Sequence, residues 1–185
     1  MTERPIPPRP GKGAPQARLA EILRVDHAGE LAAVHIYRGQ RAVFQAGRPA
    51  LAERFKAMEA GEADHLAAFD RLLNQRRVRP SLLAPLWRTA AFALGAGTAL
   101  IGEKAAHACT EAVEQVIEEH YAGQIDELRV AEPALAADLS GFRDDEIAHR
   151  AAAIDAGARE APGYGLLSAV IRAGCRAAIK IAEKV

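Results

Sequence analysis

Two short motifs in the chain pair a carboxylate with an imidazole at the spacing of one helical turn. They are Glu62-x-x-His65 and Glu146-x-x-His149. Residues three apart lie on the same face of an α-helix, so each motif could bind one metal ion from a single helix. Either motif alone is weak evidence, because a charged residue on a solvated helix face is the commoner arrangement.

Each motif also has a glutamate at the same distance upstream. The interval from Glu30 to Glu62 equals the interval from Glu114 to Glu146. The chain therefore repeats a glutamate, a fixed interval and a Glu-x-x-His motif, and every member of the second copy is offset from its counterpart in the first by the same amount. Solvation of a helix surface explains a single glutamate, but it explains neither the shared spacing nor the repeat.

Both copies are centred on a predicted turn. The first is centred on position 46, next to Gly47 and Pro49, where a helix C-cap glycine followed by a helix-opening proline is expected. The second is centred on position 130, next to Glu132-Pro133. The metal-binding candidates are about 16 residues, or roughly 24 Å of helix, from their turn. Two antiparallel hairpins would therefore place four glutamates and two histidines in one layer.

This donor set is typical of a two-metal centre in a helical bundle. Ferritin-like di-iron proteins use one glutamate from each of two helices and a Glu-x-x-His motif from each of the other two. Buried carboxylates are costly unless they are paired or bind metal, and two divalent ions would balance four of them. Mixed carboxylate and imidazole ligands favour iron or manganese, whereas zinc usually takes fewer ligands. The predicted ligands are Glu30, Glu62, His65, Glu114, Glu146 and His149.

Acidic residues next to these positions could support the ligands from outside. Asp26 lies four residues before Glu30 and shares its helix face, so it could accept a hydrogen bond from a ligand histidine. Asp144 and Asp145, beside Glu146, could do the same. A plain solvated helix charge is an equally good interpretation of each.

Other residues near the repeat have open roles. Tyr121 lies two turns from Glu114 and either lines a cavity beside the site or is an ordinary core tyrosine, and His120 is its neighbour. Glu59 and Glu118 would replace predicted ligands if the register were different, but neither completes the repeat.

The elements that must position these residues are all helical. Alanine and leucine dominate, and no run of β-branched residues indicates a strand. The expected helices span about 17–46, 50–75, 103–130, 133–156 and 166–184, with an apolar segment at 82–101. We expect an all-α, ferritin-like four-helix core with additional apolar or amphipathic helices, in one domain covering residues 17–185. Residues 1–16, with five prolines and no apolar stretch, predict a flexible arm and no secretory signal.

The apolar segment at 82–101 has two possible interpretations. It carries one charge, Arg88, and is long enough to span a membrane, but Pro85, Gly95 and Gly97 weaken that interpretation. A buried core helix and a helix that rests on or dips into a bilayer surface are both consistent with its sequence.

The last predicted helix has two different faces. Its apolar face would consist of Leu167, Val170, Ile171, Gly174, Cys175 and Ala178, and its basic stripe of Arg172, Arg176, Lys180 and Lys184. A basic amphipathic helix can lie on an anionic membrane, and it can equally be a packing helix with a solvated basic face.

Composition excludes some classes of protein. Twenty-four basic and 24 acidic residues give no net charge, which argues against a nucleic-acid-binding protein. Two cysteines, Cys109 and Cys175, predict no disulfide framework and a reducing compartment. The glycine-rich fingerprint of a dinucleotide-binding fold is absent, so no bound nicotinamide or flavin dinucleotide is predicted from the sequence.

Several segments resemble one known family, the demethoxyubiquinone hydroxylases, also called 2-polyprenyl-3-methyl-6-methoxy-1,4-benzoquinone monooxygenases. The resemblance covers about residues 20–185. The matching segments are Arg24–Glu30, Ile36-Tyr37, Gly39-Gln40, Ala108–Thr110, Ala112–Glu114, His120-Tyr121, Gln124-Ile125, Phe142–Asp144, Glu146 with His149, and Ala173–Arg176. Two residues depart from the family pattern: Gly61 stands next to a predicted ligand, and His35 replaces a different polar residue.

The resemblance implies a reaction and its setting. It implies the same six ligands around two iron ions, O2 as co-substrate, NADH as electron donor, and hydroxylation of a polyprenyl methoxy-benzoquinone in ubiquinone biosynthesis. It also implies a role for His120 and Tyr121 in handling the quinone or its electrons. The expected location is peripheral, on the cytoplasmic face of a bacterial inner membrane or the matrix face of a mitochondrial one. Segments 82–101 and 166–184 would meet the membrane, with a second copy or a biosynthetic protein as further partners.

Three alternatives are left open by the sequence. A rubrerythrin-like peroxidase would need paired C-x-x-C motifs, which this chain lacks. An iron-storage cage would expose the apolar 82–101 segment in a soluble shell. A helical interaction protein without metal would leave the repeat unexplained.

Overall fold

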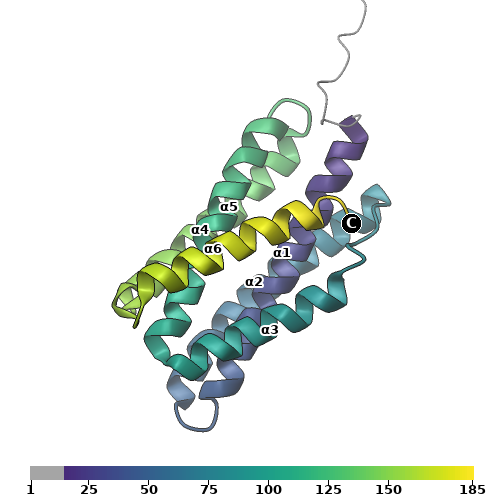
Figure 1. Ribbon diagram of the computed structural model, residues 1–185. Helices are drawn as coiled ribbons and strands as arrows, with labels where there is room; N and C mark the ends of the chain where they lie inside the picture. Colours follow the sequence, from purple (N-terminus) through teal and green to yellow (C-terminus); the bar gives the residue numbers. More distant parts are fainter. Residues whose placement is uncertain (1–14) are drawn as a thin grey trace, which may run out of the picture.

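The computed structural model describes residues 15–185, which form six α-helices and one short 3-10 turn without any β-strand (Figure 1). The helices are α1 (Pro15–Phe44), α2 (Pro49–Arg76), α3 (Ala84–Ile101), α4 (Glu103–Leu128), α5 (Pro133–Asp155) and α6 (Tyr164–Ala182). The all-α prediction is therefore confirmed. The predicted arm lies outside the described residues except at 15–16, which begin α1. The division into an arm and one domain stays a prediction.

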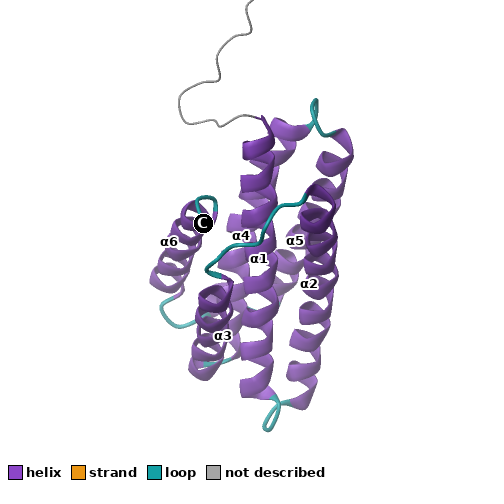
Figure 2. Cartoon of the chain, turned by 90° about the vertical axis from the view of Figure 1, so that its right-hand side faces the viewer, coloured by secondary structure: helices purple, strands orange, loops and turns teal. Residues whose placement is uncertain are grey.

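Four helices form the core as two antiparallel hairpins, α1 with α2 and α4 with α5. Their turns lie at opposite ends of the bundle, so the hairpins are related head to tail (Figure 2). Two apolar clusters fill the two halves of the bundle interior. One contains Leu23, Phe69 and Leu139 from three different core helices, and the other contains Phe44 and Phe55. This is the ferritin-like arrangement that the repeat predicts.

The turns explain why the helix boundaries were predictable to within a few residues. Pro49 and Pro133 stand in the first turns of α2 and α5, where a proline loses no hydrogen bond. The prediction of a C-cap glycine at Gly47 is wrong, since Gly47 is not among the described residues with positive φ. The backbone instead stays close to helical there, because the Arg48 N–H donates to the Phe44 carbonyl at 2.8 Å.

Helices α3 and α6 form an outer layer on one side of the bundle, against α1 and α4 (Figure 2). The α1 and α3 backbones touch at two glycines. A Cβ atom at Gly95 would lie 2.0 Å from the Ile36 carbonyl oxygen, and one at Gly39 would lie 2.3 Å from the Phe92 carbonyl oxygen. Only glycine permits this close approach.

The interpretation of 82–101 as a buried core helix is wrong. One face of α3 is buried through Ala91, Gly95, Thr98 and Ala99, because it meets α1. The opposite face is open, and Leu100 is 75% exposed. Within residues 15–185, no helix has the length and apolar character needed to cross a membrane.

Helix α6 faces the bundle differently from its predicted apolar stripe. Ser168, Ile171 and Ala182 are buried, whereas Val170 is 61% exposed and Gly174 lies on the outer surface.

Much of the basic stripe of α6 makes contacts within the chain. Arg172 donates to Gln115 Oε1 at 3.3 Å, Arg176 pairs with Glu119 at 3.0 Å, and Lys184 pairs with Glu21 at 3.1 Å. Three of the four predicted basic residues of α6 are therefore held by α4 or α1.

Candidate metal centre

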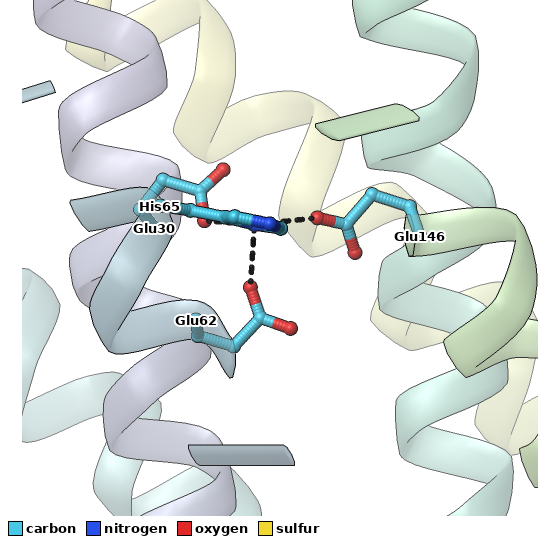
Figure 3. Close-up of side chains that lie close together, drawn as sticks. All are labelled: Glu30, Glu62, His65 and Glu146. Carbon is cyan, nitrogen blue, oxygen red and sulfur yellow. Dashed lines mark ion pairs between the residues drawn. The ribbon is translucent and has the colours of Figure 1, made fainter. Parts of the chain in front are cut away.

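The structure brings all six predicted ligands together midway along the four core helices. Five of them are no more than 5% exposed, and His149 is half-buried. They form two groups in which one donor atom per residue lies within 4.8 Å of all the others. The first group is Glu30, Glu62, His65 and Glu146, and the second is Glu62, Glu114, Glu146 and His149. In the first group, three carboxylates from three helices surround the His65 ring (Figure 3).

Glu62 and Glu146 belong to both groups and divide their oxygens between them. His65 Nδ1 lies 3.5 Å from Glu62 Oε2 and 3.5 Å from Glu146 Oε1. His149 Nδ1 lies 2.9 Å from Glu62 Oε1 and 3.7 Å from Glu146 Oε2. Each of these carboxylates therefore turns one oxygen towards each histidine, which is the geometry needed to bridge two cations.

The atoms that face the middle of the cluster are buried and make no hydrogen bonds within residues 15–185. These atoms are Glu30 Oε2, both oxygens of Glu62 and of Glu146, Glu114 Oε2, and Nδ1 of His65 and of His149. Buried polar atoms are almost always satisfied, so eight unsatisfied ones in one place need an explanation. Two divalent cations would use all eight as ligands, and the residues therefore fit a two-metal centre.

Two tyrosines hold the outer carboxylates from the opposite hairpin. The Tyr37 hydroxyl on α1 donates to Glu114 Oε1 at 2.5 Å, and the Tyr121 hydroxyl on α4 donates to Glu30 Oε1. Each hydroxyl occupies one oxygen and leaves the other, Oε2, facing the cluster. Burial and the nearby carboxylates raise the pKa of both tyrosines, which keeps the hydroxyls protonated as donors.

Sequence reasoning missed Tyr37, although the repeat contained it. Tyr37 follows Glu30 at the same interval at which Tyr121 follows Glu114, so the two tyrosines are counterparts in the two copies of the repeat. The reciprocal contact could have been found by extending the repeat beyond its charged residues.

The electrostatics of the cluster follow from burial and from the ion pairs. Burial raises the pKa of Glu30 and of Glu114 well above the usual range. Burial also opposes ionisation of Glu146, but the nearby imidazoles of His149 and His65 outweigh it and lower its pKa to about 2. Burial lowers the pKa of His149, but Glu146 and Glu62 outweigh that effect and raise it to about 10. The cluster is thus built to attract positive charge.

The acidic neighbours Asp145 and Asp26 contact different residues, and only Asp145 contacts a predicted ligand histidine. Asp145 Oδ2 lies 3.1 Å from His65 Nε2, which is the outward-facing ring nitrogen. The prediction that Asp26 supports a ligand histidine is wrong. Asp26 Oδ1 accepts from Gln124 at 2.8 Å and lies 3.4 Å from His120 Nε2. Asp26 shares a face with Glu30, but α4 stands opposite that face, whereas the ligand histidines are on α2 and α5.

The alternative ligands lie outside the cluster. Glu59 pairs with Arg38 and Arg41, and Glu118 pairs with Arg150 and more distantly with Arg143. Because neither glutamate belongs to the cluster, the register of the repeat stands. The exposed Asp144 is also absent from both groups of clustered residues in the described chain.

An apolar cavity of about 90 Å³ lies next to this layer, between α1, α4 and the outer helices. Gly29 and Val113 line it, and each directly precedes one of the clustered glutamates, Glu30 and Glu114. Trp87 of α3 and the half-buried Cys175 of α6 complete its outer wall. Tyr121 does not line this cavity, because its side chain points to Glu30.

Comparisons with known proteins agree on one family. The family model described as ubiquinone biosynthesis protein COQ7 matches residues 17–182. A protein of Rhodospirillum rubrum named 3-demethoxyubiquinol 3-hydroxylase is 49% identical over 95% of this chain and 82% of its own length. The human protein named NADPH-dependent 3-demethoxyubiquinone 3-hydroxylase, mitochondrial, is 44% identical over 92% of this chain and 79% of its own. The Saccharomyces cerevisiae protein named 5-demethoxyubiquinone hydroxylase, mitochondrial, is 42% identical over 93% of this chain and 80% of its own length.

Proposed function

The chain belongs to the family of ubiquinone biosynthesis protein COQ7, and on this premise we propose that it is a di-iron monooxygenase that hydroxylates the ring of a demethoxyubiquinone. The observation that carries the proposal is the buried cluster in which Glu62 and Glu146 each turn one oxygen to either histidine. Relatives named as hydroxylases of this substrate class support the same reaction.

In this proposal Glu30 and His65 would hold one iron ion, Glu114 and His149 would hold the other, and Glu62 and Glu146 would contribute to both. Two carboxylate-rich nitrogen and oxygen sites in a helical bundle favour iron over zinc. Bound iron supplies the two-electron chemistry of O2 that a side chain cannot perform. The overall balance is one ring C–H, O2, two electrons and two protons converted to one ring C–OH and one water.

The chain's own residues orient the carboxylates of the metal centre and exclude water from it. Tyr37 and Tyr121 fix the outer carboxylates by hydrogen bonds, so that the remaining oxygens point inward. The apolar clusters at both ends of the layer exclude water, which would otherwise compete for reactive species.

We assign the quinone ring to the apolar cavity beside Glu30 and Glu114. Its volume of about 90 Å³ is smaller than the cavity of about 150 Å³ that holds benzene in another protein. A substituted ring therefore requires α6 to move outward. No other element covers its outer face within the described chain, and the side-chain contacts to α4 and α1 would have to give way.

The outer helices give a route for a polyprenyl tail. Five apolar side chains of the two helices that wall the cavity are more than half exposed: Leu86, Leu100 and Ile101 of α3 and Leu166 and Val170 of α6. We propose that this apolar surface docks on the cytoplasmic face of a bacterial inner membrane or the matrix face of a mitochondrial one. The basic stripe contributes less than predicted, because most of it pairs within the chain.

The electron donor in the proposal is a reduced nicotinamide. The family resemblance implies NADH, whereas the human and mouse relatives carry NADPH in their names. Both are therefore tested side by side.

The test is reconstitution with Fe²⁺, a short-chain demethoxyubiquinone, either nicotinamide and ¹⁸O2. The expected result is a product that carries one ¹⁸O atom, formed by the wild type and by Glu118→Ala but not by Glu114→Ala. Glu118 is the matched control because it lies one turn further along α4 and pairs with arginines at the surface. A product without ¹⁸O, or iron uptake far beyond two ions per chain without turnover, would reject the proposal in favour of another oxidase or iron storage.

A further inference from the structure

The symmetry of the metal layer is broken at the position just before each shared glutamate. The predicted ligands and the two tyrosines match between the copies: Glu30 with Glu114, Tyr37 with Tyr121, Glu62 with Glu146, and His65 with His149. The position just before each shared glutamate does not follow this rule. It holds Asp145 in the second copy and Gly61 in the first.

This break leaves the two histidines in unequal surroundings. Asp145 lies 3.1 Å from His65 Nε2, the Phe142 ring centroid is 4.5 Å from the His65 ring centroid, and the His65 side chain is only 7% exposed. The His149 side chain is 22% exposed, and no residue of 15–185 hydrogen-bonds its Nε2. The outer nitrogen of His149 thus lacks the carboxylate contact that His65 has.

Position 61 is where the missing support would stand. A Cβ atom at Gly61 would lie 3.8 Å from both Cε1 and Nε2 of His149, with no other neighbour within 4 Å. A Cβ atom therefore fits there in ordinary van der Waals contact, and a carboxylate attached to it would start 3.8 Å from the outer nitrogen of the ring. The open space at Gly61 is therefore the counterpart of the contact that Asp145 makes with His65.

A carboxylate on the outer nitrogen of a ligand histidine fixes the ring and makes it a stronger donor, and its loss typically lowers metal affinity about 10- to 100-fold. The tyrosines and the shared glutamates are matched on both sides and do not create a difference. We infer that the two metal positions are unequal: the Glu30–His65 position fills first and holds its ion tightly, the Glu114–His149 position is the exchangeable one, and the residue at 61 sets the difference. This inference rests on the proposed two-metal function.

The test is a titration of metal-free protein with Mn²⁺, followed by electron paramagnetic resonance, which separates an isolated bound ion from a coupled pair. In the wild type, the first equivalent should give an isolated bound ion, and the coupled pair should form only with the second, at least about tenfold weaker. Asp145→Ala should weaken the first step by about 10- to 100-fold. Asp144→Ala removes a neighbouring carboxylate that is also exposed and makes no hydrogen bond or ion pair with His65 within the described chain, and it should leave both steps unchanged.

Two substitutions at position 61 test the other half of the inference. Gly61→Asp should strengthen the second step and bring the two constants together, whereas Gly61→Ala, which adds a methyl group without a carboxylate, should not. His149→Ala should still bind one ion tightly, and His65→Ala should lose the tight step.

The outcomes separate this inference from the proposed function. If the wild type binds two ions with equal constants, or if Gly61→Asp leaves the ratio of the constants unchanged, the inference is overturned while the two-metal function stands. If the protein binds no Mn²⁺ or Fe²⁺ at all, both are overturned.

Discussion

The inner bundle buries charged side chains, whereas the outer layer exposes apolar ones. The inner helices α1, α2, α4 and α5 bury four glutamates in the middle of an apolar core, whereas the outer helices α3 and α6 leave leucine, isoleucine and valine side chains in solvent. Both arrangements are unfavourable for a protein that does nothing but fold, since charge is normally outside and large apolar surface inside. The proposed function gives each arrangement a partner: cations for the inner bundle and a membrane surface for the outer layer.

The largest effect should come from removing a shared ligand of the inner bundle. Glu62→Ala takes one oxygen from each metal group, so we expect both ions to be lost and turnover to fall more than about 100-fold, while the helices remain. Iron analysis measures the loss of the ions, and circular dichroism measures whether the helices remain. Glu59→Ala, one turn earlier on α2 and paired with arginines, is the control that should keep two ions. Two ions retained in Glu62→Ala would show that the shared carboxylates do not bind metal.

The next effect concerns the junction between the two regions. Gly95→Ala forces a methyl group into the Ile36 backbone, and such overpacking should lower the free energy of unfolding by about 1–3 kcal/mol or more. Gly97→Ala on the same helix meets no atom within 4 Å and should instead be neutral or stabilising by up to about 1 kcal/mol. Thermal unfolding of the two variants measures the difference. Equal unfolding temperatures would mean that α3 does not pack on α1 through these glycines.

A smaller effect on folding, but a specific one on docking, is expected from the exposed face of α3. Replacing Leu100 and Ile101 by serine should weaken binding to liposomes by at least about tenfold, because burying one such side chain in an apolar phase contributes about 1.5–3 kcal/mol. The free energy of unfolding should change by no more than about 0.5 kcal/mol. Val130→Ser, at an exposed site in the α4–α5 turn, should change neither quantity. Unaltered flotation of the double variant would contradict docking through α3.

The smallest effect is expected from the basic stripe of α6. Arg176 pairs with Glu119 in a solvent-exposed salt bridge, so Arg176→Ala should cost less than about 1 kcal/mol in stability. Lys180 has no ion-pair partner within residues 15–185, so Lys180→Ala should weaken binding to anionic vesicles more than Arg176→Ala does. The reverse order would mean that Arg176 exchanges its partner for lipid.

The repeat made the metal layer predictable from sequence, and the outer layer was harder to predict. Spacing between glutamates, with turns at the midpoints, determines the height of each residue in a hairpin, and the family resemblance is confirmed. Spacing does not determine which helix stands opposite a given face. For that reason the predicted partner of Asp26, a ligand histidine, was wrong, since Asp26 accepts from Gln124. The hydrogen bond from Tyr37 to Glu114 was missed for the same reason. The same limit applies to α3 and α6, whose apolar stripes do not reveal how much of each face another helix covers.

The unsatisfied atoms of the metal layer also link the lifetime of this protein to its surroundings. Ions that bind only the native chain stabilise it by mass action, by about 2.7 kcal/mol for each ion at a free concentration of 100 times its dissociation constant. If iron is the bound metal, as proposed, that contribution disappears when its supply falls, and four carboxylates in a dry interior then favour the unfolded chain. Cellular proteases remove unfolded chains continuously. Scarcity of iron should therefore reduce the amount of this protein as well as its activity.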